Sequence, residues 1–217
     1  MREPNAWPDP PLVAILRGVR PDEVVAVGWA LVDAGIRIIE VPLNSPEPFA
    51  SIERLARALH DRALVGAGTL RWKNKVAEVA RAGGRLVVTP HADPNIVRAA
   101  KELDLFAVPG VATPTEAFAM LDAGADALKL FPAEMLGPAV VKALVTVLPT
   151  GTRLIPVGGI TPEKIATFRS AGASGFGLGS ALYRPGSTAA EVCERARAFV
   201  DAWRTATPGQ SINAVAS

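Results

Sequence analysis

The stretch Gly124-Ala-Asp-Ala-Leu-Lys-Leu-Phe-Pro132 predicts a short buried β-strand over residues 126–131, bounded by a glycine and a proline. Side chains alternate between the two faces of a strand, so Leu128 and Leu130 share one face while Lys129 lies on the other. A lysine is almost never fully buried without a partner. Either the strand end is solvated, which this stretch alone favours, or burial lowers the pKa of Lys129 and supplies the neutral amine that Schiff-base chemistry needs.

Length and composition indicate one globular unit. With 217 residues, of which 49% are apolar, the chain is long enough for a single α/β domain with a sizeable core. The net charge of +2 comes from scattered residues and predicts neither a nucleic-acid partner nor an acidic membrane surface. The single cysteine, Cys193, excludes an internal disulfide and a cysteine-based metal site. No apolar run has the length of a membrane span, and the first ten residues lack a signal-peptide core, so we expect a soluble cytoplasmic protein.

Eight short apolar runs alternate with amphipathic stretches along the chain. The expected strands cover residues 12–17, 37–42, 63–68, 85–90, 105–110, 126–131, 153–158 and 175–179. The expected helices cover about residues 22–34, 46–60, 72–82, 94–103, 113–123, 138–147, 162–171 and 188–204. Eight such units favour a closed (β/α)8 TIM barrel over residues 12–204, with an open doubly wound sheet as the alternative. We expect residues 1–11 to form an arm and residues 205–217 a flexible tail.

Polar residues lie near, at or directly after the carboxyl ends of four of these runs. Arg17 closes the first run and Glu40 lies late in the second, while Thr69 follows the third and Lys129 lies late in the sixth. Alternation groups them with apolar neighbours on the expected inner face: Val13, Ile15 and Arg17; Ile38, Glu40 and Pro42; Val65, Ala67 and Thr69. Each has an ordinary explanation singly, such as a solvated strand end, a paired surface carboxylate or a helix N-cap. Because barrel active sites lie at the carboxyl ends of the strands, four coincidences favour one shared site.

Glycine clusters follow the last two expected strands, as Val157-Gly158-Gly159-Ile160 and Gly177-Leu-Gly179-Ser180-Ala-Leu-Tyr183. Glycine allows the backbone to approach a ligand closely, and barrel enzymes often bind phosphate with these two loops and a short extra helix. We expect residues 180–183 to form that helix, with its positive dipole end toward the anion. Ordinary turn glycines are the alternative, but their position after both strands favours phosphate.

Few other residues are candidates for chemistry. His60 and His91 are far apart in the sequence and predict no metal site. Glu134 follows the Lys129 strand and either borders the pocket or is solvated, as most loop carboxylates are. We therefore expect neither a metal nor a cofactor.

Seven motifs together resemble the class I 2-keto-3-deoxy-6-phosphogluconate/galactonate aldolases. They are Pro11-Leu-Val-Ala-Ile-Leu-Arg-Gly18, Ile39-Glu-Val-Pro-Leu-Asn-Ser-Pro46, Val65-Gly-Ala-Gly-Thr69, Val88-Thr-Pro90, Leu128-Lys-Leu-Phe-Pro132, Val157-Gly-Gly159 and Gly177-Leu-Gly-Ser180, and they span about residues 11–186. The resemblance implies a (β/α)8 barrel, usually a homotrimer, that needs no metal. Such an enzyme cleaves a phosphorylated 2-keto-3-deoxy sugar acid to pyruvate and glyceraldehyde 3-phosphate.

The resemblance also implies roles for individual residues. Lys129 matches the Schiff-base lysine, Glu40 the general acid/base, and Arg17 and Thr69 the positions that hold the pyruvate end of the substrate. The remaining matches are Gly158, Gly159, Gly179 and Ser180 around the phosphate, and Pro90 and Phe131 in the pocket wall. Gluconate-type members resemble one another in carrying an arginine shortly after the glutamate. The chain has Asn44 there, which is similar to the galactonate-specific branch.

Three other functions compete with a galactonate-type aldolase. A gluconate-type aldolase would use the same mechanism on the C4 epimer. A non-catalytic barrel that binds a phosphorylated metabolite would show binding without turnover, and the joint presence of Lys129 and Glu40 argues against it. A phosphosugar isomerase on the same fold would have no use for a lysine in a strand.

Overall fold

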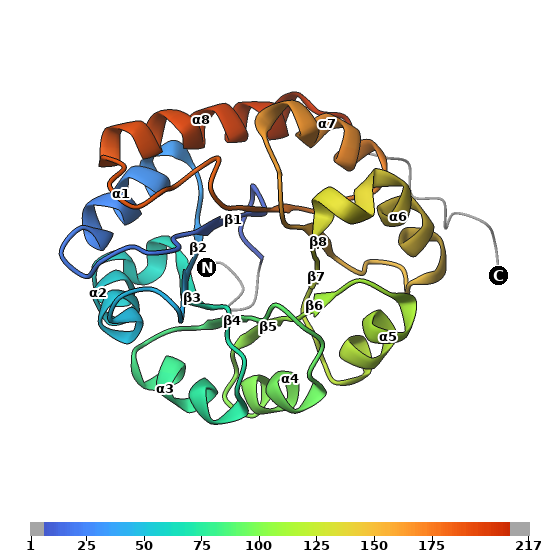
Figure 1. The fold of residues 1–217 in the computed structure, drawn as a ribbon, viewed down its shortest axis with the longest axis horizontal. Helices are drawn as coiled ribbons and strands as arrows, with labels where there is room; N and C mark the ends of the chain where they lie inside the picture. The colour runs from blue at the N-terminus through green and yellow to red at the C-terminus, as the bar shows by residue number, and fades with distance from the viewer. Residues whose placement is uncertain (1–6, 209–217) are drawn as a thin grey trace.

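The structure, a computed structural model, describes residues 7–208, in which strands and helices alternate (Figure 1). The strands are β1 Leu12–Ile15, β2 Ile38–Pro42, β3 Leu64–Gly68, β4 Leu86–Val88, β5 Phe106–Val108, β6 Gly110–Val111, β7 Leu128–Leu130, β8 Leu154–Pro156 and β9 Phe176–Leu178. The α-helices are α1 Val24–Ala34, α2 Pro48–Leu59, α3 Val76–Arg81, α4 Pro94–Lys101, α5 Pro114–Asp122, α6 Ala133–Val147, α7 Pro162–Ser170 and α8 Ala189–Thr205, and the 3-10 helices are η1 His60–Arg62 and η2 Lys73–Lys75. Residues 1–6 of the predicted arm and 209–217 of the predicted tail lie outside the described residues, so the division into arm, domain and tail stays a prediction.

Local chemistry sets several helix boundaries. Thr113 begins α5 with a capping box, in which its hydroxyl accepts from the Glu116 amide and the Glu116 carboxylate accepts from the Thr113 amide at 2.9 Å. Gly35 ends α1 in the left-handed region, at φ 101°, which agrees with the predicted end of this helix at residue 34. Helix α6 begins earlier than the predicted residue 138, because Gly137 takes a non-helical conformation and lets one more turn form ahead of Pro138. Within residues 7–208, no helix is long and apolar enough to cross a membrane.

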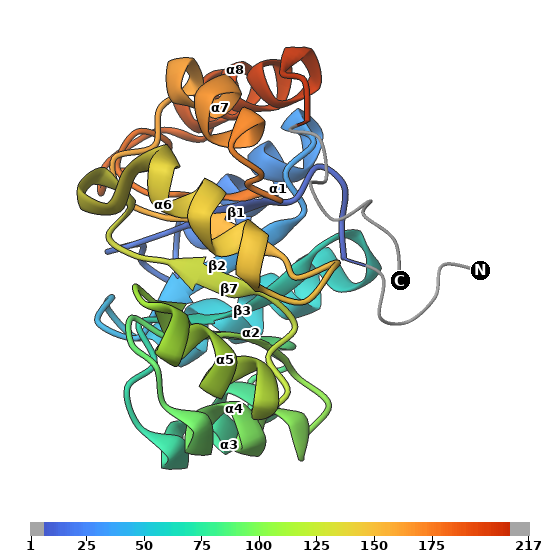
Figure 2. The ribbon, with the colours of Figure 1, turned by 90° about the vertical axis from the view of Figure 1, so that its right-hand side faces the viewer.

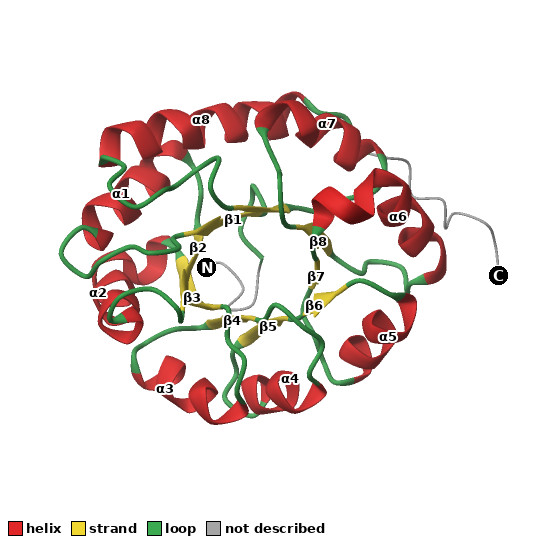
Figure 3. Cartoon of the chain, viewed as in Figure 1, coloured by secondary structure: helices red, strands yellow, loops and turns green. Residues whose placement is uncertain are grey.

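All the paired strands run parallel, as the alternation with helices predicted. One sheet has the order β5-β4-β3-β2-β1-β9 and curls into a half-barrel, and a second has the order β6-β7-β8. Helices lie outside the strands (Figures 1 and 3), and α5 and α6 cover the side on which β7 lies (Figure 2). The predicted fifth strand is divided into β5 and β6 at Pro109, which has no N–H to donate to a ladder. A parallel bridge between Val157 and Gly177 continues from β8 toward β9.

Apolar side chains fill both faces of the strands, which accounts for runs without polar alternation. The larger cluster packs between strands and helices. The smaller, inner cluster contains Val13, Ile15, Ile38, Leu64, Leu86, Val88, Val108, Ala127, Ile155 and Val157. Trp7, from the predicted arm, packs on this inner cluster, with its ring centroid 5.8 Å from that of Phe106.

The faces of β3 are exchanged relative to the prediction. Leu64 lies in the inner cluster, whereas Val65 and Ala67 lie in the outer one, so their predicted inward orientation was wrong. The parallel pairing of Ile38 with Leu64 fixes this arrangement. A shift of one residue exchanges the two faces of a strand, and β3 is apolar on both, so its sequence could not reveal the register.

Candidate active site

Lys129 lies in the middle of β7 on the inner face of the strands. Its strand neighbours are Gly110 on β6 and Ile155 on β8, and its side chain is only 5% exposed. The Nζ atom lies 4.7 Å from the ring centroid of Phe131, two residues further along the chain. Burial lowers the pKa of the Lys129 ammonium, and the charge of Glu40 acts in the opposite direction. The structure therefore has a desolvated amine at this position rather than a solvated strand end.

Glu40 lies in β2 and is more deeply buried than Lys129, at 1% exposure. Burial raises the pKa of Glu40 to about 7, while the positive charges of Lys129 and Arg17 act to lower it. Its Oε2 atom has no hydrogen-bond partner among the described residues. Buried carboxylate oxygens are normally paired, so this orphaned acceptor points to a ligand or water as its partner.

Gly68 makes the space that the Glu40 carboxylate occupies. A Cβ atom built on Gly68 would overlap the Oε2 atom of Glu40. Any other residue at the end of β3 would force the carboxylate away from its position. The sequence analysis missed this role, although a glycine at the end of a buried strand, in Gly66-Ala-Gly68, was a visible signal.

Arg17, Asn44 and Thr69 form a polar group where β1, β2 and β3 end. Arg17 donates from Nη1 to Asn44 Oδ1 at 2.9 Å and from Nη2 to Thr69 Oγ1 at 3.3 Å. Thr69 reaches Arg17 because its backbone turns into the left-handed region, at φ 51°, directly after β3. Arg17 and Thr69 therefore lie together, as one shared site requires, but Thr69 reaches Arg17 through a turn rather than through the predicted alternation.

Pro90 lies beside the Lys129 strand. A Cβ atom on Gly110, the strand neighbour of Lys129, would lie 2.6 Å from the carbonyl carbon of Pro90, so only glycine allows this approach. The preceding residue, Thr89, is buried and accepts from the Gly110 amide at 3.3 Å. These contacts hold Pro90 against β6, the strand next to the one that carries Lys129.

The glycine turn after β8 has a left-handed backbone at two consecutive residues, with φ 113° at Gly158 and 62° at Gly159. A Cβ atom on Gly158 would overlap the Glu134 carboxylate, which therefore lies against this turn, although Glu134 as a whole is exposed. Lys164 donates from Nζ to the Gly159 carbonyl oxygen at 2.6 Å and brings a positive charge that the sequence analysis missed.

The turn after β9 differs from the predicted short helix over residues 180–183. The structure has a single turn, in which the amides of Leu182 and Tyr183 both donate to the Gly179 carbonyl oxygen, at 2.9 and 3.0 Å. The prediction of a helix was wrong because Arg184 and Pro185 follow at once and Pro185 has no amide to extend it. A Cβ atom on Gly179 would meet no atom within 4 Å, so the turn faces open space.

These side chains lie within two residues of the carboxyl ends of their strands, and the glycine turns follow β8 and β9. This is the edge at which barrel enzymes have their active sites. Within residues 7–208, no group of three or more His, Cys, Asp or Glu side chains is placed to hold a metal ion. The independence from metals and cofactors stays a prediction. The chemical groups present are an amine, a carboxylate with a raised pKa, a guanidinium and two glycine turns.

Comparisons with known proteins agree on one family. The family model described as KDPG and KHG aldolase matches residues 6–199. The 2-dehydro-3-deoxy-6-phosphogalactonate aldolase of Escherichia coli (strain K12) is 46% identical over 196 residues, which cover 90% of this chain and 96% of that protein. A solved structure described as native KDPGal has a TM-score of 0.89 at 46% identity and covers 90% of this chain and 95% of that one. A designed cube-shaped cage, made by fusing symmetric oligomeric domains, has a TM-score of 0.87 at 46% identity and covers 89% of this chain and 72% of that one. The chain belongs to the KDPG and KHG aldolase family.

Proposed function

We propose that the chain cleaves 2-dehydro-3-deoxy-6-phosphogalactonate to pyruvate and glyceraldehyde 3-phosphate through a Schiff base on Lys129. The observation that carries the proposal is the burial of Lys129 together with Glu40, whose carboxylate has an unpartnered oxygen and a pKa raised to about 7. The similarity to the Escherichia coli galactonate enzyme supports the choice of substrate.

The mechanism begins with attack of the neutral Lys129 amine on the C2 ketone of the substrate. The lowered pKa of Lys129 favours this neutral form. Loss of water from the carbinolamine gives a protonated imine. When the C4 hydroxyl loses its proton, the electrons of the C3–C4 bond move to the imine, which releases the aldehyde and leaves an enamine. Protonation of the enamine at C3 and hydrolysis of the imine release pyruvate and restore the amine.

Glu40 carries the protons for these steps. A group with a pKa near the working pH is an effective general acid and base, because both protonation states are populated. With a pKa of about 7, Glu40 fits that condition, whereas an ordinary glutamate would stay ionised. Its unpartnered Oε2 atom is free to exchange a proton with the substrate or with a water molecule.

The two ends of the substrate would bind on opposite sides of the amine. Arg17 and Thr69 hold the carboxylate next to C2, and Pro90 and Phe131 form the wall. The phosphate binds to the backbone amides of the two glycine turns, Gly158–Gly159 and Gly179–Ser180. Left-handed glycines and an open Gly179 support this assignment, since backbone N–H groups in such turns bind anions.

Asn44 supports the galactonate epimer over the gluconate alternative. It accepts a hydrogen bond from Arg17 at 2.9 Å. An arginine at this position, the gluconate-type pattern, would place two positive charges in contact and would require a different arrangement of Arg17. Cleavage rates for the two C4 epimers measure the preference, and faster cleavage of the gluconate epimer would assign the chain to the alternative substrate.

A closed (β/α)8 barrel and a homotrimer are the finer parts of the proposal. The bridge from Val157 to Gly177 supports closure between β8 and β9. The designed cage built from symmetric oligomeric domains supports an oligomer. Trp72 and Leu103, which are 54% and 44% exposed near an apolar groove between α3 and α4, supply a surface that an oligomer would cover. A cytoplasmic location stays a prediction from the sequence.

Trapping with borohydride in the presence of pyruvate tests the mechanism. We expect one stable adduct, which peptide mapping assigns to Lys129. Lys142, an exposed lysine of α6, serves as the matched control because its replacement by alanine should leave the adduct unchanged. An adduct on any other lysine would overturn the assignment.

A further inference from the structure

Tyr183 is the only tyrosine of the chain, and it lies directly after the turn assigned to the phosphate. It is 2% exposed, yet its hydroxyl donates to Glu23 Oε1 at 3.1 Å. Its own amide donates to the Gly179 carbonyl oxygen at 3.0 Å. Tyr183 thus contacts the glycine turn through its backbone and another loop through its side chain.

Glu23 lies in the loop that connects Arg17 to α1. Its Oε1 atom accepts from the Arg20 amide at 3.0 Å as well as from Tyr183. One carboxylate oxygen therefore joins the loop after β1 to the turn after β9. Burial and the nearby Glu23 charge raise the pKa of Tyr183, so the phenol keeps the proton that it donates.

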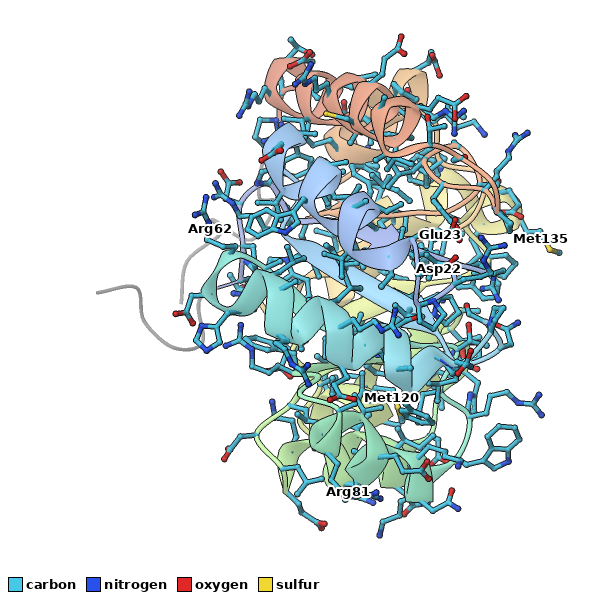
Figure 4. The ribbon with its side chains drawn as sticks, turned by 90° about the vertical axis from the view of Figure 1, so that its left-hand side faces the viewer. Asp22, Glu23, Arg62, Arg81, Met120 and Met135 are labelled. Carbon is cyan, nitrogen blue, oxygen red and sulfur yellow. The ribbon has the colours of Figure 1, made fainter. Side chains whose placement is uncertain are left out.

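Two further contacts fix the same loop. A Cβ atom on Gly18 would lie 2.8 Å from Cγ of Pro185, so the two loops pack at close range. The Gly18 amide donates to Ser45 Oγ at 2.9 Å, and Ser45 is buried. Figure 4 shows Glu23 on the same side of the molecule as Met135, which follows β7, and away from Arg62, which precedes β3. The contact between Tyr183 and Glu23 thus lies at the edge with the candidate site.

We propose that Tyr183 and Glu23 are positioning residues that hold the phosphate turn at a fixed distance from the Arg17 loop. The proposal rests on the proposed function, which places the substrate phosphate at Gly179 and its carboxylate at Arg17. The hydrogen bond between Tyr183 and Glu23 then sets the span between the two anionic groups. It favours a ligand that engages both ends at once and contributes little to a ligand that engages one end.

Kinetics of Tyr183→Phe test this role. The change removes the hydroxyl and keeps the buried ring, so we expect KM for the phosphorylated substrate to rise about tenfold, the loss associated with one hydrogen bond to a charged group. Trapping of pyruvate, KM for the unphosphorylated substrate and affinity for inorganic phosphate should change less than about twofold, because each occupies only one end. An equal change in KM for both substrates, or no change in a folded variant, would overturn the proposal.

Glu23 variants complete a double-mutant cycle. Glu23→Gln keeps an oxygen acceptor without the charge and should raise KM less than Tyr183→Phe does, whereas Glu23→Ala should raise it at least as much, because it also removes the acceptor of the Arg20 amide. The double variant should be no worse than Glu23→Ala alone, since the Tyr183 hydroxyl has already lost its acceptor there. Additive effects would show that each acts separately and would contradict the proposal. Lys101→Met, which breaks the 2.7 Å pair with Asp126, is the stability control, because it should lower Tm without altering the ratio of the two KM values.

A spectroscopic readout separates this proposal from the proposed function. Incorporation of 3-fluorotyrosine gives one 19F resonance, because the chain has a single tyrosine. We expect inorganic phosphate to shift it in the wild-type protein and in Glu23→Gln, but not in Gly179→Val. A phosphate-dependent shift without turnover of either epimer would remove the proposed function and retain the link to Tyr183. Turnover with an unresponsive resonance and an unchanged KM in Tyr183→Phe would remove the link and retain the function.

Discussion

The two ends of the candidate site differ in their exposure to water: the reacting end is buried and the phosphate end is open. At the reacting end, Lys129 and Glu40 are almost completely buried. Burial lowers the pKa of Lys129 and raises that of Glu40, so it favours the neutral form of each. At the phosphate end, Gly158 and Gly159 have left-handed backbone and Gly179 faces open space. Gly159 and Ser180 are exposed. Chemistry here requires a group removed from water, whereas anion binding requires accessible N–H groups. Variants at the two ends should therefore fail in different ways.

The largest effect should come from Lys129→Ala, because this change removes the one buried lysine of residues 7–208. Cleavage should fall to background, and pyruvate with borohydride should give no adduct in a folded protein. Circular dichroism checks the fold, and Lys142→Ala provides the active reference. A Lys129→Ala variant that retains turnover would remove the Schiff base from the mechanism.

Glu40→Gln should lower kcat by about 10²–10⁴-fold, the usual contribution of a general acid or base, with little change in KM. The amide keeps the size of the side chain but cannot exchange protons, so slow trapping of pyruvate should persist. The matched control is Glu53→Gln, at an exposed glutamate of α2. A normal kcat in Glu40→Gln would assign proton transfer to another group.

The same variant should be more stable than the wild-type protein at high pH. The folded-state pKa of Glu40 is about 7, above its ordinary value of 4.5, so the folded protein binds this proton more tightly than the unfolded chain does. Ionisation of Glu40 therefore reduces stability as pH rises from 4.5 to about 7, and the cost is constant above that range. Urea unfolding at about pH 8 should show a gain of about 3 kcal/mol for Glu40→Gln, and a much smaller gain at about pH 5. Equal gains at both values would mean that the carboxylate is ionised throughout.

At the open end, Gly179→Val should raise KM for the phosphorylated substrate by about tenfold and leave pyruvate trapping intact. The valine would fill the space that a phosphate needs, while pyruvate carries no phosphate. Ala139→Val, at an exposed position of α6, controls for the added side chain. Loss of trapping in folded Gly179→Val would place this turn at the reacting end instead.

The smallest expected effect is that of a chelator. Dialysis against one should leave kcat and KM unchanged, since the mechanism uses an amine as electron sink and no Lewis acid. Loss of activity that a divalent cation restores would contradict the prediction.

The sequence predicted the elements that strong local signals define. The strand around Lys129 could be predicted from its apolar run, and Glu40 and Arg17 could be placed in or just after the neighbouring strands because they interrupt or end such runs. The parallel α/β fold followed from the regular alternation of strands and helices.

Features that depend on tertiary register or single dihedral angles could not be predicted in this way. The inward face of β3 is set by pairing with β2, and Thr69 reaches Arg17 only because its φ is 51°. Lys164 reaches the Gly159 carbonyl from a later helix, so no motif around either residue predicts the contact. The roles of the site residues themselves stay predictions until the variants are measured.

Gly68 has a consequence for how substitutions at different positions depend on one another. It is not expected to touch the substrate, yet alanine there would displace the Glu40 carboxylate, so an activity screen would score it with the catalytic residues. The substitutions that position 68 tolerates depend on the length of the Glu40 side chain, whose carboxylate lies against Gly68. In Glu40→Asp the shorter side chain vacates part of that space, and Gly68→Ala should then cost less than it does beside a glutamate. The residue that position 68 of β3 accepts therefore depends on the residue at position 40 of β2. A change at position 68 should be tolerated only together with a shorter side chain at position 40.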